Sequence, residues 1–94
     1  MKKNLIDFTE KNINAVKIYD QLRPCCDNVM RFGDRVLVAQ ANYRGEFEGA
    51  VYGFVENPDE CWCPSESELI LLKVADQTFE DAGHAIEWCI KNAH

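Results

Sequence analysis

The sequence predicts an α+β domain in which an antiparallel sheet of three or four strands lies between two terminal helices. Apolar residues recur at helical spacing near both ends, whereas the middle holds Val- and Leu-rich segments separated by turn residues. The chain has 94 residues, which is enough for one hydrophobic core and too few for two. We therefore predict a single domain over residues 1–94 with the order α-β-β-β-α.

The first helix is predicted over residues 8–22. Its apolar side chains recur on one side, and its polar side chains lie opposite them. Asp7 followed three residues later by Glu10 is typical of a helix start. Pro24 ends the helix, because the residue before a proline is disfavoured in the helical region.

Four segments in the middle of the chain have strand character. They are Val29–Phe32, Arg35–Tyr43, Phe47–Glu56 and Glu68–Ala75. The pair Gly33-Asp34 suits a two-residue hairpin turn. Gly49 and Gly53 inside the third segment indicate a bulge, a strong twist or close packing against the backbone. The last segment carries aliphatic side chains on both faces, so we expect it to be the central strand.

The last helix is predicted to begin at Thr78, with Asp81 three residues later completing a capping box. Its predicted buried stripe consists of Phe79, Ala82, Ile86, Cys89, Ile90 and Ala93. Trp88 lies well away from the centre of that stripe. It is therefore either covered by another part of the chain or exposed as an anchor for a partner.

Charge is distributed unevenly along the chain, whose formal net charge is −6. Residues 1–44 carry eight Lys or Arg and five Asp or Glu, whereas residues 45–94 carry two and eleven. The two halves therefore have net charges of +3 and −9. An anionic surface repels phosphate backbones and anionic lipids, and it attracts basic protein surfaces. We expect no direct nucleic-acid partner and no membrane partner.

Residues 45–72 contain carboxylates but no Lys or Arg. The seven carboxylates are Glu46, Glu48, Glu56, Asp59, Glu60, Glu66 and Glu68. Trp62 lies among them, and an aromatic side chain within a charged rim has the composition of a binding hot spot. The run is either a solvated surface or a patch that docks onto Lys and Arg clusters. The candidate partner-binding residues are these seven carboxylates with Trp62 and Trp88.

The cysteines and one histidine offer an alternative reading as a small metal- or ligand-binding domain. The residues that would serve it are Cys25, Cys26, Cys61, Cys63 and His84. Adjacent cysteines and a C-x-C pair bring sulfurs together poorly around zinc, so we expect reduced thiols, no metal and no cofactor. Glu80, His84 and Glu87 share one flank of the last helix, either as half of a metal site or as a solvated face.

No arrangement of residues names a reaction, so we expect a protein that is not an enzyme. The first residues lack the pattern of a signal peptide, and the longest apolar run, residues 69–72, is too short to cross a membrane. We therefore expect a cytoplasmic protein with reduced thiols. A homodimer that pairs sheet edges or buries Trp88 is compatible with these expectations.

The order helix, three strands, helix resembles that of double-stranded-RNA-binding domains, which dock phosphates through basic residues at the start of the last helix. Here that start is Thr78-Phe79-Glu80-Asp81, which is acidic. In size and acidity, with its cation-free stretch at residues 45–72, the chain resembles small inhibitors made by phages and mobile elements, of the anti-CRISPR or anti-restriction type. This resemblance implies a protein-binding module that occupies a basic surface of a larger protein, such as a nucleic-acid-handling complex of host defence.

Overall fold

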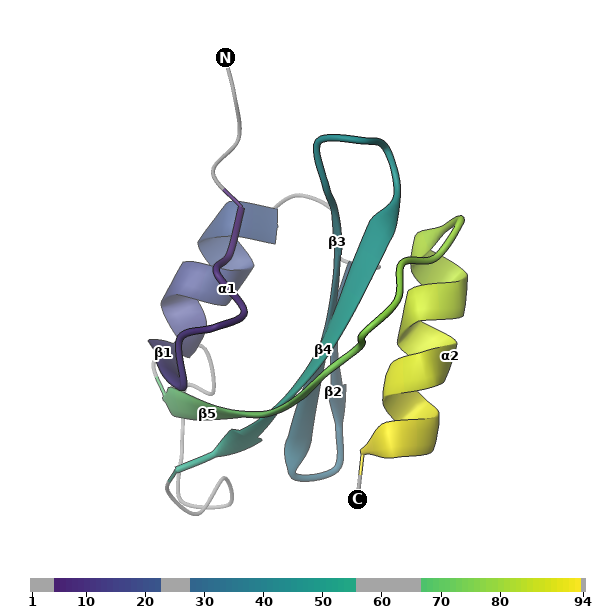
Figure 1. The fold of residues 1–94 in the computed structure, drawn as a ribbon. Helices are drawn as coiled ribbons and strands as arrows, with labels where there is room; N and C mark the ends of the chain where they lie inside the picture. The colour runs from purple at the N-terminus through teal and green to yellow at the C-terminus, as the bar shows by residue number, and fades with distance from the viewer. Residues whose placement is uncertain (1–4, 23–27, 56–66, 94) are drawn as a thin grey trace.

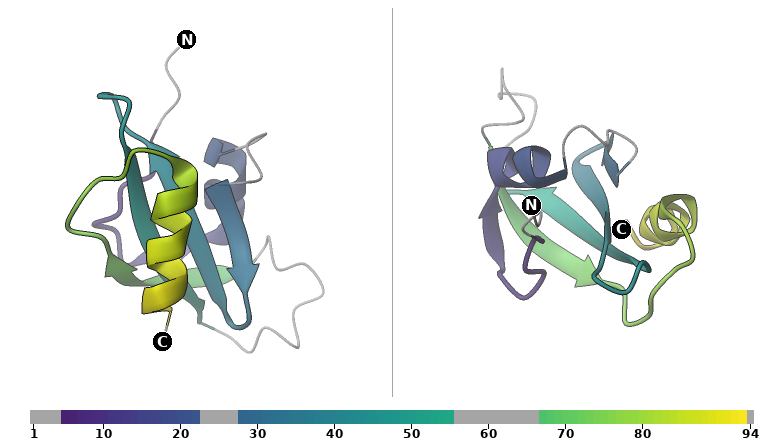
Figure 2. Two further views of the ribbon diagram at one scale, coloured as in Figure 1. Left: turned by 90° about the vertical axis from the view of Figure 1, so that its right-hand side faces the viewer. Right: turned by 90° about the horizontal axis from the view of Figure 1, so that it is seen from above.

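A computed structural model describes residues 5–22, 28–55 and 67–93. Within these residues an antiparallel five-stranded sheet lies between two helices, one on each face (Figures 1 and 2). The elements are β1 (Asn12–Asn14), α1 (Ala15–Leu22), β2 (Val29–Phe32), β3 (Arg35–Ala41), β4 (Phe47–Phe54), β5 (Glu68–Val74) and α2 (Ala82–Asn92). The strand order in the sheet is β1-β5-β4-β3-β2. The predicted α+β class is confirmed, and the sheet has one strand more than the largest number predicted.

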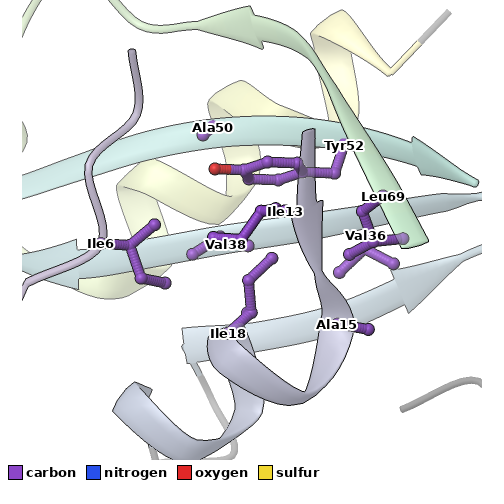
Figure 3. Close-up of a cluster of buried hydrophobic side chains, with 9 residues drawn as sticks. All are labelled: Ile6, Ile13, Ala15, Ile18, Val36, Val38, Ala50, Tyr52 and Leu69. Carbon is purple, nitrogen blue, oxygen red and sulfur yellow. The ribbon is translucent and has the colours of Figure 1, made fainter. Parts of the chain in front are cut away.

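Alternation along the inner strands divides the core into two clusters, because successive side chains of a strand point to opposite faces. On the α1 face lie Ile6, Ile13, Ala15, Ile18, Val36, Val38, Ala50, Tyr52 and Leu69 (Figure 3). On the α2 face lie Leu37, Ala39, Val51, Ala85, Ile86 and Cys89. The sheet is therefore covered on both faces over β3 and β4, and α2 packs on these two strands.

The additional strand is β1, which occupies residues predicted to be helical. Its register pairs Asn12 with Ile70 and Asn14 with Glu68 on β5. The side chain of Asn14 accepts a hydrogen bond from the backbone N–H of Val16 at 2.8 Å, which favours a helix that begins after Asn14 rather than at residue 8. The prediction of a helix over residues 8–22 was therefore wrong in its first seven residues.

The predicted strands are confirmed with ends that differ by one or two residues, but the predicted centre of the sheet was wrong. The central strand is β4, which pairs with β3 and β5. On β5 the aliphatic side chains are unequally covered: Leu69 is fully buried, whereas Ile70 and Leu72 are 37% and 45% exposed. Aliphatic residues on both faces of a strand therefore did not mean burial on both faces.

Helix α2 begins four residues later than predicted. The N-cap is Asp81, whose side chain accepts a hydrogen bond from the backbone N–H of His84 at 2.8 Å. Before the cap, Phe79 exchanges two backbone hydrogen bonds of 2.9 Å with Phe47 at the start of β4. Of the predicted stripe, Cys89 is buried as expected, whereas Ile90 is 38% exposed.

The two glycines of β4 lie where close packing requires a small residue. A Cβ atom on Gly49 would lie 3.3 Å from the backbone oxygen of Ala85 on α2. A Cβ atom on Gly53 would lie 3.0 Å from the side chain of Leu72, next to an irregularity in the β4–β5 register. Of the alternatives that the glycines indicated, close packing against the backbone is confirmed at both positions. No helix within the described ranges is long and apolar enough to span a membrane.

Candidate functional site

An open cleft of about 580 Å³ lies on the α1 side of the sheet, between the N-terminal segment, β4 and the loop that follows β5. Its lining residues come from these three segments: Ile6, Asp7, Phe8, Thr9, Glu48, Val74, Ala75, Asp76, Gln77 and Thr78. We call it the acidic cleft, because three of its lining residues are carboxylates. Segments nearly seventy residues apart in the sequence form its two walls, so only the fold brings them together.

Gln40 holds the N-terminal wall of the acidic cleft in place. It is 1% exposed on β3, and its side chain forms two hydrogen bonds with the backbone of Ile6. The N–H of Ile6 donates to Oε1 at 3.0 Å, and Nε2 donates to the Ile6 carbonyl oxygen at 2.9 Å. The same Nε2 lies 3.4 Å from Oε1 of Glu48. One buried amide thus fixes the wall and contacts one of the carboxylates.

The carboxylates of the acidic cleft are Asp7, Glu48 and Asp76. The ion pairs found within the described part of the chain all use other carboxylates. The hydroxyl and backbone N–H of Thr9 donate to the side chain of Asp7 at 2.6 and 2.9 Å, and these bonds lower the pKa of Asp7. At the rim, Thr78 donates its hydroxyl proton to Glu46 at 2.8 Å.

The arrangement of these groups does not suit a metal ion. Among the residues that the structure describes, no three His, Cys, Asp or Glu side chains are grouped so that they could hold one. Two apolar side chains, the partly buried Phe8 and the exposed Val74, line the acidic cleft together with its carboxylates. Such a combination of apolar and anionic groups fits a side chain with an aliphatic stem and a cationic end.

Tyr52 lies next to the acidic cleft and carries an unusual hydroxyl group. The residue is fully buried, and its hydroxyl has no hydrogen-bond partner among the described residues. In Figure 3 this hydroxyl points along the sheet towards Ile6, which lines the cleft. Burial raises the pKa of Tyr52, with a smaller contribution from the negative charges of Glu10 and Asp7. The phenol is therefore held neutral beside an anionic surface.

The predicted partner-binding residues are only partly gathered at this site. Glu48 lines the acidic cleft, and Glu46 is joined to it through Thr78. Glu68 is exposed at the start of β5, whereas the cleft is lined by the end of that strand, Val74. The remaining predicted residues of the acidic run, Glu56, Asp59, Glu60, Trp62 and Glu66, lie outside the described residues.

Trp88 packs on the opposite face of the sheet. It is partly buried against the α2-side core cluster, and its ring centroid lies 6.4 Å from that of Phe79. The sequence left open whether Trp88 is covered by another part of the chain or exposed as an anchor, and in the structure it is partly covered by the chain itself. Trp88 thus packs on the α2 side of the sheet, whereas the acidic cleft lies on the α1 side.

Of the residues of the alternative metal or ligand site, His84 alone lies within the described residues. Cys25, Cys26, Cys61 and Cys63 lie outside the described residues. His84 is exposed on α2, with its Nδ1 atom 3.3 Å from the side chain of Asp81. Cys89 is a free, buried thiol, and burial raises its pKa to about 11.

Sequence reasoning missed Asp7, Asp76, Gln40 and Tyr52. Asp7 was read as a helix start, although its side chain instead accepts hydrogen bonds from Thr9 in a turn before β1. The one local signal was Gln40, a polar residue inside the apolar run of β3. A buried polar side chain in such a run requires a partner, and here the partner forms the wall of the cleft.

The model of the protein family described as nucleotide modification associated domain 4 (Nmad4) matches residues 8–93. The chain belongs to the Nmad4 family. The match covers both helices, the whole sheet and most of the acidic cleft, so the family is defined over the same unit as the fold. No curated protein and no solved structure matches the chain.

Proposed function

We propose that this chain is a non-enzymatic protein-binding module that occupies a basic surface of a larger protein. The observation that carries the proposal is the acidic cleft, whose carboxylates Asp7, Glu48 and Asp76 take part in none of the ion pairs found among the described residues. Carboxylates around a concave surface attract Lys and Arg side chains and speed association with a basic protein.

The charge of the whole chain supports the same partner class. The net charge of −6 and the cation-free stretch at residues 45–72 oppose binding to phosphate backbones or anionic lipids. The same charge attracts a protein partner that has a basic surface. The proposal therefore includes no direct nucleic-acid or membrane contact, and it assigns the module to the cytoplasm.

The description of the Nmad4 family supports one kind of basic partner protein. It associates the domain with nucleotide modification. Proteins that act on nucleotides or nucleic acids bind phosphate groups through Lys and Arg. We therefore propose a protein of nucleotide modification as the partner, with inhibition as the effect where the module covers the surface that binds phosphate.

The test is capture of partners by the tagged full-length chain from cells that contain its natural gene neighbours, followed by binding measurements with the purified partner. We expect affinity that falls steeply with salt and is lost when the cleft carboxylates Asp7, Glu48 and Asp76 are changed to Lys. Binding that is insensitive to both salt and charge reversal would contradict the proposal, as would recovery of nucleic acid alone.

A second copy of the chain is another candidate partner, favoured by the edge strand β2. Met30 and Phe32 on this strand are 41% and 44% exposed, and β2 pairs only with β3 among the described strands. An edge strand with exposed apolar side chains can pair with its copy. Light scattering after size exclusion tests this proposal: a dimer that becomes monomeric with Phe32→Glu supports it, and a monomeric native chain rejects it.

A further inference from the structure

We infer that the acidic cleft is a pocket for the guanidinium group of one arginine of the partner protein. This inference rests on the proposed function and makes it specific, because it replaces general attraction between surfaces with one side chain in one pocket.

The walls fit the stem and the plane of an arginine side chain. Val74, which is 40% exposed, offers apolar surface to the three methylene groups, and the partly buried Phe8 offers an aromatic ring. Arginine stacks on aromatic rings more readily than lysine does, because its guanidinium group is flat and weakly hydrated. This chain already uses such a contact, since the guanidinium carbon of Arg31 lies 5.2 Å from the ring centroid of Phe54.

The carboxylates are placed for a group with several donors. Asp7, Glu48 and Asp76 come from three different segments and line one cleft, yet they are not grouped as metal ligands among the described residues. A guanidinium group presents five N–H donors around a plane, whereas an ammonium group is a compact point charge. Acceptors from three segments around one cleft therefore suit the several donors of an arginine side chain.

Tyr52 supplies an independent observation on the same side of the sheet. Its hydroxyl is buried, has no partner among the described residues, and points towards Ile6 of the cleft wall (Figure 3). A buried polar group without a partner is uncommon in folded proteins and requires an explanation. A guanidinium N–H entering beside Ile6 would donate to this phenolic oxygen. Because the hydroxyl is closed to solvent in the free protein, binding would include a small shift of the N-terminal wall.

The experiment is a titration of the ¹⁵N-labelled full-length chain with three blocked tripeptides that differ only in the central residue: arginine, lysine or citrulline. Citrulline has the shape of arginine without its charge. We expect the arginine peptide to shift the amide signals of residues 6–9 and 74–78, and to bind roughly tenfold more tightly than the citrulline peptide. Equal binding of these two peptides, or shifts confined to other segments, would overturn the inference.

Variants then assign the contacts. The double variant Glu48→Gln and Asp76→Asn should lower the affinity for the arginine peptide by about tenfold. The matched double variant Asp20→Asn and Glu80→Gln, outside the cleft, should leave this affinity unchanged. Tyr52→Phe should weaken binding of the arginine peptide by about threefold without lowering the melting temperature, because the hydroxyl has no hydrogen-bond partner among the described residues. Equal losses from both pairs would show that only the overall charge matters.

The same variants separate this inference from the proposed function. If the captured partner binds with strong salt dependence but is indifferent to Glu48→Gln with Asp76→Asn, the arginine pocket is wrong and the basic-surface module remains. If the arginine peptide binds the cleft but no basic protein is captured, the pocket is supported and the proposed partner class fails.

Discussion

The two faces of the sheet are closed in different ways. On the α2 face, the helix backbone approaches Gly49 closely, and the buried side chains beneath it are apolar apart from the thiol of Cys89. On the α1 face, part of the cover is an N-terminal segment held by Gln40, with the unpartnered Tyr52 hydroxyl nearby. One face is built for close packing, whereas the other carries the polar groups and the cleft.

This difference separates the face that stabilises the fold from the face on which we place the proposed binding site. Close packing of a helix onto a glycine leaves no room for a ligand, so that face serves the core. Buried polar groups are costly unless they are paired, and they concentrate where a protein uses them for recognition. The four predictions below test this contrast, from the largest expected effect to the smallest.

The largest effect is expected from Gly49→Val on the α2 face. The new side chain would meet the backbone of Ala85, which cannot move without shifting α2, and overpacking of this kind costs about 3 kcal/mol. Urea unfolding measures the loss. Ala41→Val, an exposed position on the neighbouring strand β3, is the matched control and should cost little. A Gly49→Val variant as stable as the native chain would show that α2 is not fixed on this strand.

On the α1 face, Gln40→Leu should cost about 2 kcal/mol, because it leaves the buried N–H and carbonyl of Ile6 without their partners. The loss should be local: hydrogen exchange at Ile6 should accelerate more than exchange in β3 or β4. Gln21→Leu is the control, since the buried Oε1 of Gln21 has no partner among the described residues. Uniform acceleration across the sheet would mean that Gln40 supports the whole fold rather than the cleft wall.

The α2 face could be predicted from the sequence more fully than the α1 face. Periodicity and glycine placement are local signals. They predicted the hairpins, the helix near the C-terminus that covers this face and the close packing at Gly49. The start of α2 was misplaced because Thr78 and Asp81 are both acceptable caps. The pairing of Phe79 with Phe47 decided between them, and this is a tertiary contact.

The acidic cleft could be predicted only in part, because it depends on β1. Residues 12–14 have weak local preference, and pairing with β5 overrides the helical pattern of the surrounding residues. The pairing of β1 with β5 and the hydrogen bonds of Gln40 together bring Asp7 into the same cleft as Asp76. The uneven charge drew attention to Glu46 and Glu48, but charge along the sequence does not say which carboxylates share a cleft.

Alkaline pH should destabilise both faces to a smaller extent. Burial raises the pKa of Cys89 from 9.0 to about 11, and it also raises that of Tyr52. Both groups stay neutral in the folded chain while they ionise in the unfolded chain, so their contribution is present below the unfolded pKa and is lost as the pH rises towards the folded value. Above pH ~9, we expect the free energy of unfolding to fall by about 1 kcal/mol per pH unit for each group that is ionised in the unfolded chain and neutral in the folded chain.

Two substitutions divide this pH dependence between the faces. Cys89→Ala should flatten the decline that begins near the ordinary thiol pKa of 9.0, and Tyr52→Phe should flatten the part near the ordinary phenol pKa of 10.0. Urea unfolding at several pH values measures both. A decline that neither substitution alters would have to arise from other groups, and the contrast between a neutral phenol and an anionic cleft would lose its support.

The smallest effect is expected at the rim of the acidic cleft, from Thr9→Ala. The Thr9 hydroxyl, followed by its backbone N–H, lowers the pKa of Asp7 below its ordinary value of 3.8. Loss of the hydroxyl should raise that pKa towards 3.8, and Thr9→Ser should preserve it. NMR titration of the Asp7 carboxyl carbon gives the value directly. Because the lowered pKa keeps Asp7 charged as the pH falls, binding of the arginine peptide should weaken at a higher pH in Thr9→Ala than in Thr9→Ser. Identical pH profiles would show that Asp7 is a bystander and that the cleft binds through Glu48 and Asp76 alone.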